Sequence, residues 1–320
     1  MRLPPVRRSL RRIARRLGLP FGREPRVAPA RVARDDPEAA AHFAKARSFS
    51  GPPPPGWIVD FLGIRTQWKF VDGHWPHTAE QVSQMWQSLP SPEVNGLEYY
   101  EWLDLLHAVR AARDRFVFVE LGAGYGRWVV RAAKLLERLN PMAYALVAVE
   151  AEPTHFAWMR EHLFDNGIDP AEHHLVPGPV AATRGPVRFL VGNAATCYGQ
   201  EIVRARRVRH DGLQVETMPA IPLEEILEPY SKVDLIDLDV QGAELDVLAP
   251  AIDLLDARAG RLQIGTHGPA IEQGLRRLFE AHGWQLRQEF PCGSKMFLPA
   301  LGRELDVEDG VQTWVNPRLA

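Results

Sequence analysis

Residues 116–130, "FVFVELGAGYGRWVV", constrain the fold more than any other stretch of this 320-residue chain. Apolar and β-branched residues lead to one carboxylate, Glu120, and glycines follow at every second position, Gly122, Gly124 and Gly126, before an apolar helical pattern begins. Glycines after a first strand let the backbone turn sharply and approach a ligand closely. The order of strand, acid, glycine turn and helix therefore predicts the first unit of a nucleotide-binding α/β fold.

From residue 116 onward, strand-like and helix-like patterns alternate along the chain. We expect strands over residues 116–121, 145–150, 173–177, 233–239, 261–267 and 284–290. We expect helices over residues 125–139, 153–166, 242–256 and 270–282. An antiparallel strand pair near 187–191 and 213–217 interrupts this series, and the tail "KMFLP…GVQTWVNP" can supply a last strand. The alternation predicts a doubly wound, mostly parallel, Rossmann-like sheet with helices on both faces.

The chain before this sheet divides into two segments. Residues 1–56 are basic and proline-rich, and the four prolines of "SGPPPPGW" are typical of an extended linker, so we expect a disordered tail and linker. Residues 57–114 hold five of the nine tryptophans and two helical patterns, of which the first has Thr78 as its expected N-cap. We expect this helical extension either to form a substrate lid or to pack against the flank of the sheet domain, residues 115–320.

Charge is distributed unevenly along the chain. Residues 1–34 carry eleven arginines and one acid, about +10, so the net charge of −2 leaves about −12 on the remainder. Because the body is acidic, we do not expect nucleic acid as a partner. Residues 1–20 place four apolar side chains on one helical face among arginines, a pattern that fits either weak binding to an anionic membrane surface or a solvated tail.

Three features of the sequence predict the compartment. No apolar run approaches the roughly 20 residues of a membrane span. The basic N-terminus lacks the apolar core of a secretory signal, and the two cysteines form no CxxC pair. We therefore expect a cytoplasmic protein that could lie against the inner face of a membrane through residues 1–20.

The glycine turn discriminates among three classes of ligand. A phosphate-binding loop needs Gly-Lys-Ser/Thr, which "GRW" does not provide, and the dinucleotide fingerprint GxGxxG needs a glycine where Arg127 stands. The acid two residues before the first glycine repels a pyrophosphate and attracts an amine, which favours S-adenosylmethionine as the ligand. Glu150, at the end of the second strand, can accept both ribose hydroxyls, with Glu152 as the competing acid. A tight turn in another doubly wound fold is the alternative.

A second informative stretch is "VDLIDLDVQGAELDVL", residues 233–248. Asp237 and Asp239 alternate on one strand, and Gly242 and Glu244 begin the following helix. Ligands of open α/β sheets bind beyond the carboxyl ends of the strands, so Asp239 should lie where the transferred methyl group and its acceptor meet. Alternatively, Asp239 or Glu244 only caps the helix, since acids favour helix N-termini.

These motifs together resemble the FkbM-type methyltransferases, which depend on S-adenosylmethionine and mostly methylate hydroxyl groups. The segment "DLDVQGAE" is similar to the family's "KIDVEGAE", with Asp239, Gly242 and Glu244 matching, and "ELGAGYG" and "VAVEAEP" look like its first two motifs. The resemblance covers roughly residues 115–290. Where the family often shows Glu-x-His after the fifth strand, "LQIGTHGP" keeps His267 but has Gly265 in place of the acid.

The resemblance and the strand ends together predict the chemistry of the site. We expect His267 and Asp239 to be the catalytic residues, with a general base contributing about 10²- to 10⁴-fold. Asn193, Thr196 and Tyr198, together with Glu244, are the candidates to face the acceptor, which we expect to be a sugar, glycolipid or secondary metabolite.

A divalent metal site formed by Asp239, Glu244 and His267 is conceivable, but nothing in the spacing demands one, and we assign no metal. The basic run "RARRVRH", 204–210, either grips an anionic acceptor or forms a solvated loop. Two alternatives from other classes remain. One is an NAD-dependent oxidoreductase, and the other is a non-catalytic, membrane-tethered protein on a methyltransferase fold.

Overall fold

The computed structural model describes residues 36–73, 77–196, 198–203, 212–298 and 302–319. The predicted amphipathic helix of residues 1–20 and the basic run 204–210 lie outside the described residues, so both interpretations stay predictions. Within the described part, no helix is both long enough and apolar enough to cross a membrane.

The centre of the protein is a seven-stranded sheet with the order β11, β14, β10, β9, β3, β4, β5. In that order the strands are Gln285–Phe290, Gly310–Val315, Arg261–Thr266, Leu235–Leu238, Arg115–Leu121, Ala143–Glu150 and His174–Pro177. Neighbours from β10 through β5 are parallel, whereas β14 runs antiparallel to both β10 and β11. This mostly parallel α/β sheet confirms the predicted fold class.

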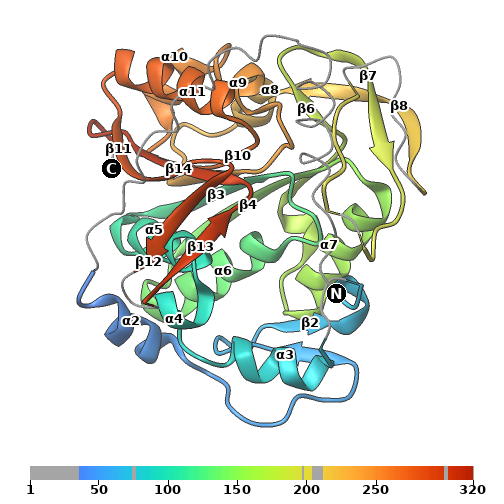
Figure 1. Cartoon of the computed structure of the whole chain (residues 1–320), viewed down its shortest axis with the longest axis vertical. Helices are drawn as coiled ribbons and strands as arrows, with labels where there is room; N and C mark the ends of the chain where they lie inside the picture. The colour runs from blue at the N-terminus through green and yellow to red at the C-terminus, as the bar shows by residue number, and fades with distance from the viewer. Residues whose placement is uncertain (1–35, 74–76, 197, 204–211, 299–301, 320) are drawn as a thin grey trace, which may run out of the picture.

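Helices cover both faces of the sheet (Figure 1). One face is covered by α5 (Glu98–Ala111), α6 (Arg127–Leu139) and α7 (Pro153–Asp165). The other is covered by α8 (Leu223–Leu227), α9 (Glu244–Leu248), α10 (Ile252–Arg258) and α11 (Pro269–Ala281). A short 3-10 helix, η2 (Pro170–Glu172), precedes β5. The two faces bury two separate hydrophobic cores.

Strand β3 shows why the sequence folds in this way. Its side chains alternate between the two cores, with Phe116 and Phe118 facing the α5–α6 side and Val117 and Val119 facing the α8–α11 side. A strand that is buried on both faces needs a continuous apolar run, which "FVFV" provides. The acidic Glu120 follows near the end of the strand.

The structure corrects one predicted helix. We expected a single helix over residues 242–256, but the chain forms α9 and α10 with a break between them. Pro250 lies in the break, and a proline inside a helix removes a backbone donor and clashes with the preceding turn.

The predicted antiparallel pair and last strand are both present. Strands β7 (Gly185–Val191) and β8 (Gln214–Pro222) pair antiparallel, and β6 (Val180–Ala181) adds to β8 in parallel. The tail forms a hairpin of β12 (Ser294–Leu298) and β13 (Arg303–Val307), and then β14. We did not predict that β14 inserts between β10 and β11, which requires pairing with residues far back in the chain.

The extension before β3 is more structured than expected. Its elements are α2 (Ala39–Ala46), β1 (Trp57–Val59), β2 (Arg65–Gln67), η1 (Trp68–Phe70), α3 (Ala79–Trp86), α4 (Pro92–Asn95) and α5. The β1–β2 hairpin corrects the expectation of a purely helical extension. Thr78 caps α3, as predicted, and the structure shows that it does so in a capping box with Gln81.

Helix α2 corrects the expectation of disorder through residue 56. Phe43 on α2 is fully buried and meets Phe61 and Trp102 edge to face, at centroid distances of 6.1 and 6.0 Å. This aromatic contact supplies the buried apolar area that the proline-rich composition concealed. Helix α5 is in turn tied to the sheet, because the Asp104 carboxylate accepts from Thr313 and Gln288 at 2.6 Å each. The extension therefore packs against the flank of the sheet.

Candidate functional site

A cavity of about 310 Å³, which we call the main cavity, lies at the carboxyl ends of the central parallel strands. Its lining includes residues 122–125 after β3, 149–151 at the end of β4, 178–180 after β5 and 239–241 after β9. This is the edge at which ligands of open α/β sheets bind. Its size suits a small molecule.

The glycine turn is shaped by close approaches of the backbone. Gly122 has φ +83°, and a Cβ there would collide with the backbone carbonyl of Asp239. Gly124 has φ +55°, and a Cβ there would lie 3.1 Å from the ring of Tyr198. The amides of Gly122 and Ala123 donate to the Val149 carbonyl at 2.9 and 3.0 Å. Strand β4 thus fixes the glycine turn, and only glycine fits at position 122, where the turn begins.

Glu150 lines the main cavity, whereas its competitor Glu152 does not. The Glu150 carboxylate accepts from the amides of Gly124 and Glu152 at 2.6 Å each. Burial raises the pKa of Glu150 to about 7, although these amides counteract part of that effect. Glu152 instead caps α7 by accepting from the amide of His155 at 2.7 Å. Of the two acids, Glu150 is the one placed to meet a ligand.

We expected Glu120 to face the ligand, but the structure places it against helix α6. Its carboxylate accepts from the amides of Val129 at 2.8 Å and Trp128 at 3.3 Å, so it joins β3 to the first turn of α6. Burial raises its pKa to about 8. Gly126 also faces the protein, because a Cβ there would lie 2.7 Å from Met159. Neither residue lines the main cavity.

Glu120 belongs instead to a second, smaller cavity of about 110 Å³, which we call the acidic cavity. Glu101, Asp237 and Asp239 also line it, and no lysine, arginine or histidine is among the described lining residues. Burial raises the pKa values of Glu101 and Asp237 well above their ordinary range. Gly265 leaves room here, because a Cβ there would lie 3.3 Å from the Asp239 carboxyl carbon.

Asp239, Glu244 and His267 come together at the ends of β9 and β10. His267 Nδ1 lies 2.7 Å from Glu244 Oε1, and its Nε2 lies 3.4 Å from Asp239 Oδ1. Glu244 is fully buried and Asp239 is about half exposed. Burial opposes protonation of His267, but Glu244 and Asp239 outweigh it and raise the pKa of the imidazole. Glu244 therefore contacts the predicted base, rather than reaching a ligand itself.

The loop after β7 brings one of three predicted residues to the main cavity. Tyr198 lines it, stacks on His155 with ring centroids 4.2 Å apart, and donates its hydroxyl to the Phe70 carbonyl. Asn193 and Thr196 are not among the lining residues. The Thr196 amide and hydroxyl both donate to the Asn193 carbonyl, which closes the loop on itself.

Comparison with known proteins identifies the family. Residues 120–288, more than half of the chain, match the family model described as the methyltransferase FkbM domain. This chain belongs to the FkbM methyltransferase family.

Individual relatives are distant. A protein of Jannaschia sp. (strain CCS1), provisionally named as a methyltransferase, is 24% identical over 272 residues, which cover 83% of this chain and 94% of the relative. The structure of methyltransferase FkbM from Methylobacillus flagellatus KT is 13% identical with a TM-score of 0.39, covering 64% of this chain and 45% of that one. An O-methyltransferase from Bacillus cereus is also 13% identical with a TM-score of 0.38, covering 71% and 84%. At these TM-scores the two structures carry no argument about the site.

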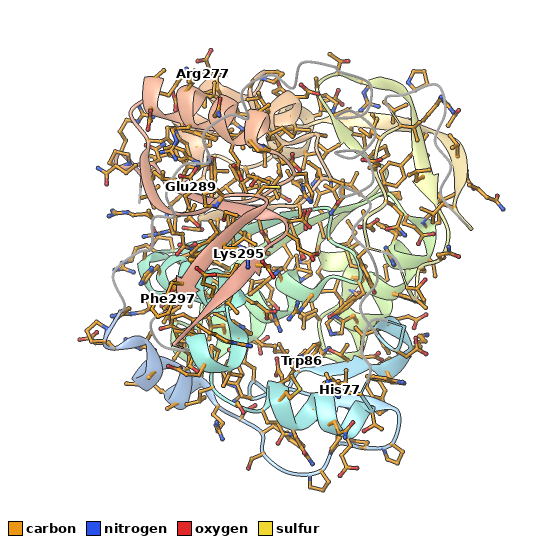
Figure 2. All side chains as sticks on the ribbon, in the orientation of Figure 1. His77, Trp86, Arg277, Glu289, Lys295 and Phe297 are labelled. Atoms are coloured by element: carbon orange, nitrogen blue, oxygen red, sulfur yellow. The ribbon has the colours of Figure 1, made fainter. Side chains whose placement is uncertain are left out.

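This FkbM methyltransferase has site residues that the sequence did not reveal. Val71 and Trp86 come from the extension and line the main cavity. His155 and Gln200, from the sheet domain, also line it. Trp86 lies at the end of α3, in the lower part of Figure 2. Arg127 also lines the cavity. Its position directly after the last glycine was the one signal in the sequence that could have indicated it.

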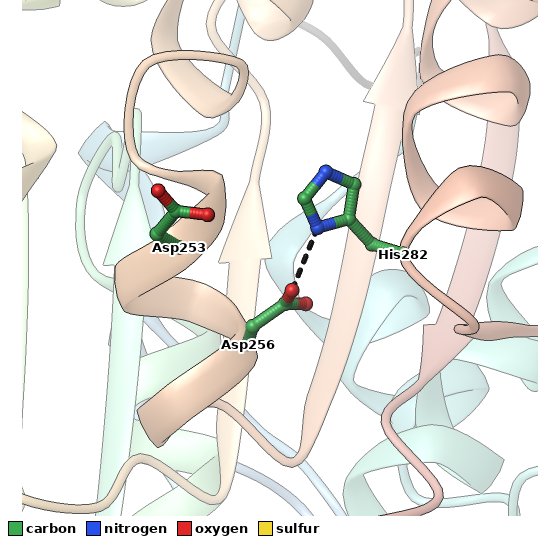
Figure 3. Close-up of side chains that lie close together, drawn as sticks. All are labelled: Asp253, Asp256 and His282. Carbon is green, nitrogen blue, oxygen red and sulfur yellow. Dashed lines mark hydrogen bonds and ion pairs between the residues drawn. The ribbon is translucent and has the colours of Figure 1, made fainter.

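One group of three side chains among the described residues has the spacing of a metal site, namely Asp253, Asp256 and His282 (Figure 3). However, Asp256 already accepts from His282 Nδ1 at 2.7 Å, from Trp284 Nε1 at 2.6 Å and from the Arg318 guanidinium at 2.9 Å. A cation would have to compete with that guanidinium. We therefore interpret the group as a structural link among α10, the end of α11 and the C-terminal residues.

Proposed function

We propose that this methyltransferase uses S-adenosylmethionine and methylates a hydroxyl group of a sugar, glycolipid or secondary metabolite. The main cavity fits such a cofactor on two observations. A buried carboxylate, Glu150, faces the cavity with the capacity to accept ribose hydroxyls. Next to it, the backbone of the glycine turn at Gly122 and Gly124 forms part of the cavity wall. Together they would hold the adenosyl part of the cofactor.

The contact between His267 and Glu244 carries the proposal of a hydroxyl acceptor. With Glu244 ionised, the 2.7 Å hydrogen bond requires the proton of the neutral imidazole on Nδ1. The lone pair is then on Nε2, 3.4 Å from Asp239 Oδ1; His267 does not itself line the main cavity but lies directly behind Asp239, which does. An acceptor hydroxyl must lose a proton on methylation, and Nε2 is placed to take it.

The mechanism follows from what each residue can do. The sulfonium of the cofactor supplies an activated methyl group and a neutral leaving group. Glu150 and the glycine turn would hold the donor, and placing two reactants together can remove about 7–11 kcal/mol of a barrier. His267 accepts the proton of the hydroxyl, and Asp239 stabilises the imidazolium that forms. Because Asp239 is about half exposed, the proton can pass from there to solvent.

A transfer assay tests this proposal. The protein is incubated with methyl-labelled S-adenosylmethionine and a panel of monosaccharides, glycolipids and hydroxylated polyketides. We expect His267→Asn to lower the rate of transfer about 10²- to 10⁴-fold and to leave binding of S-adenosylhomocysteine unchanged. His282→Asn is the matched control, because His282 lies in the Asp256 link and should leave the rate unchanged. Equal rates for wild type and His267→Asn would contradict the assigned base.

A further inference from the structure

Arg127 occupies a special position in the main cavity. It is the first residue of α6, directly after the glycine turn, and it lines the cavity together with Gly122, Gly124 and Trp86. Among the described lining residues it is the one lysine or arginine. The cavity therefore combines one acid that suits hydroxyl groups, Glu150, with one cation that suits an anion.

The guanidinium of Arg127 is held in place by its neighbours. Its Nη2 donates to both carboxylate oxygens of Glu98, at 2.6 and 2.7 Å. Its Cζ lies 5.2 Å from the ring centroid of Trp86 and 5.9 Å from that of Trp128. Burial favours a neutral Glu98, but Arg127 and Arg131 outweigh it and lower the pKa of Glu98 to about 2. Both partners are thus charged, and the side chain is oriented before any ligand arrives.

The same guanidinium keeps donors that the protein does not use. Both hydrogen bonds to Glu98 leave from Nη2. Nε is buried and has no acceptor among the residues that the structure describes. Buried donors are nearly always paired, because an unpaired one loses the hydrogen bonds that it would make in water. Nε itself is enclosed by protein, but 29% of the Arg127 side chain is exposed, so an anion in the main cavity can reach another edge of the guanidinium.

We propose that Arg127 binds the carboxylate of the amino-acid tail of S-adenosylmethionine, an inference that rests on the proposed cofactor. A guanidinium is planar and matches a carboxylate geometrically. The proposed cofactor carries one carboxylate, at the end farthest from the ribose that Glu150 would hold. Arg127 would then select methyl donors that carry this group. An acidic acceptor could supply the same chemistry, and the experiment separates the two sources.

The test compares S-adenosylmethionine with decarboxylated S-adenosylmethionine, which lacks only the carboxylate. Binding of each is measured by calorimetry, without any acceptor, to the full-length wild type and to Arg127→Gln. We expect the wild type to bind the complete molecule about 10- to 100-fold more tightly. In Arg127→Gln this preference should disappear, through weaker binding of the complete molecule alone. Arg127→Lys keeps the charge without the planar fork and should retain part of the preference.

Arg131→Gln is the matched control. Arg131 donates to the same Glu98 at 2.9 Å and packs on Trp102 and Trp128, but it does not line the main cavity. It should lower the thermal midpoint and keep the ligand preference. The proposal is overturned if Arg127→Gln weakens both ligands equally or leaves the preference intact, or if Arg131→Gln abolishes it as well.

The same data separate this inference from the proposed function. A wild type that binds neither ligand would contradict the proposed cofactor itself, and the inference with it. A wild type that binds both ligands equally would leave the cofactor standing and overturn the role of Arg127.

Discussion

The main cavity has two walls that are built on different principles. The wall at the sheet edge consists of backbone, namely the glycine turn fixed by the Val149 carbonyl and closely approached by the Asp239 carbonyl. A second wall consists of side chains, with Val71 and Trp86 from the extension and Tyr198 joined to the Phe70 carbonyl. The backbone wall has little freedom to change, whereas the side-chain wall can vary. This difference suggests that the first wall serves the donor and the second wall selects the acceptor.

The largest expected effect comes from breaking the backbone wall. Gly122→Ala forces a side chain onto φ +83° and into the Asp239 carbonyl. Backbone strain alone should lower the free energy of unfolding by about 1–3 kcal/mol, and the collision should lower it further and abolish cofactor binding. Urea denaturation measures the loss. Gly167→Ala is the control, with φ +72° but open space around it, and it should show the strain alone. Equal losses in the two variants would contradict the claim that the Asp239 carbonyl lies too close to residue 122 for any side chain.

The next effect concerns the pH dependence of the base. The pKa of His267 is raised, and the base must be neutral, so activity should fall as pH drops through that pKa. Glu244→Gln removes a carboxylate that raises it, so the acidic limb of the rate profile should move to lower pH while the maximal rate falls about tenfold. Asp246→Asn, on the same helix, should leave the limb in place. A limb that stays fixed in Glu244→Gln would contradict the pairing.

The same pair predicts how stability depends on pH. A histidine whose folded pKa lies above its unfolded value stabilises the fold below the unfolded pKa, and this contribution is lost as pH rises through the folded pKa. The difference in free energy of unfolding between wild type and Glu244→Gln should therefore be larger at pH 5 than at pH 9. Denaturation at both pH values measures it, and a difference that grows with pH would have the wrong sign.

The smallest effect comes from loosening the side-chain wall. Tyr198→Phe removes the hydrogen bond to the Phe70 carbonyl and keeps the ring on His155. We expect the free energy of unfolding to fall by about 0.5–1.5 kcal/mol and the KM for the acceptor to rise severalfold, with cofactor affinity unchanged. An altered cofactor affinity with an unaltered acceptor KM would reverse the roles given to the two walls.

The same contrast explains what the sequence could predict. Strand β3, the glycine turn and Glu150 lie in short continuous segments, and the periodicity and spacing of these segments are enough to indicate their places in the fold. Glu120 shows the limit of such patterns, because an acid before a glycine turn can face a ligand or the amides of the next helix, and the choice depends on where α6 begins. We expected the first, and the structure shows the second.

Contacts between distant segments could not be predicted. Helix α2 packs its Phe43 against Trp102, and β14 inserts between two strands that precede it. Trp86 reaches the cavity from α3, well ahead of the first strand of the sheet. Each of these placements depends on a partner far away in the chain, which periodicity does not report.

The most direct test of the account is a calorimetric titration with S-adenosylmethionine, S-adenosylhomocysteine and NADH. It uses the wild type, Glu150→Gln, and Glu152→Gln as the matched control that does not line the cavity. The account predicts that both adenosyl ligands bind the wild type and the control, that Glu150→Gln binds them much more weakly, and that NADH does not bind. Binding of NADH alone, or equal affinities in all three proteins, would contradict it.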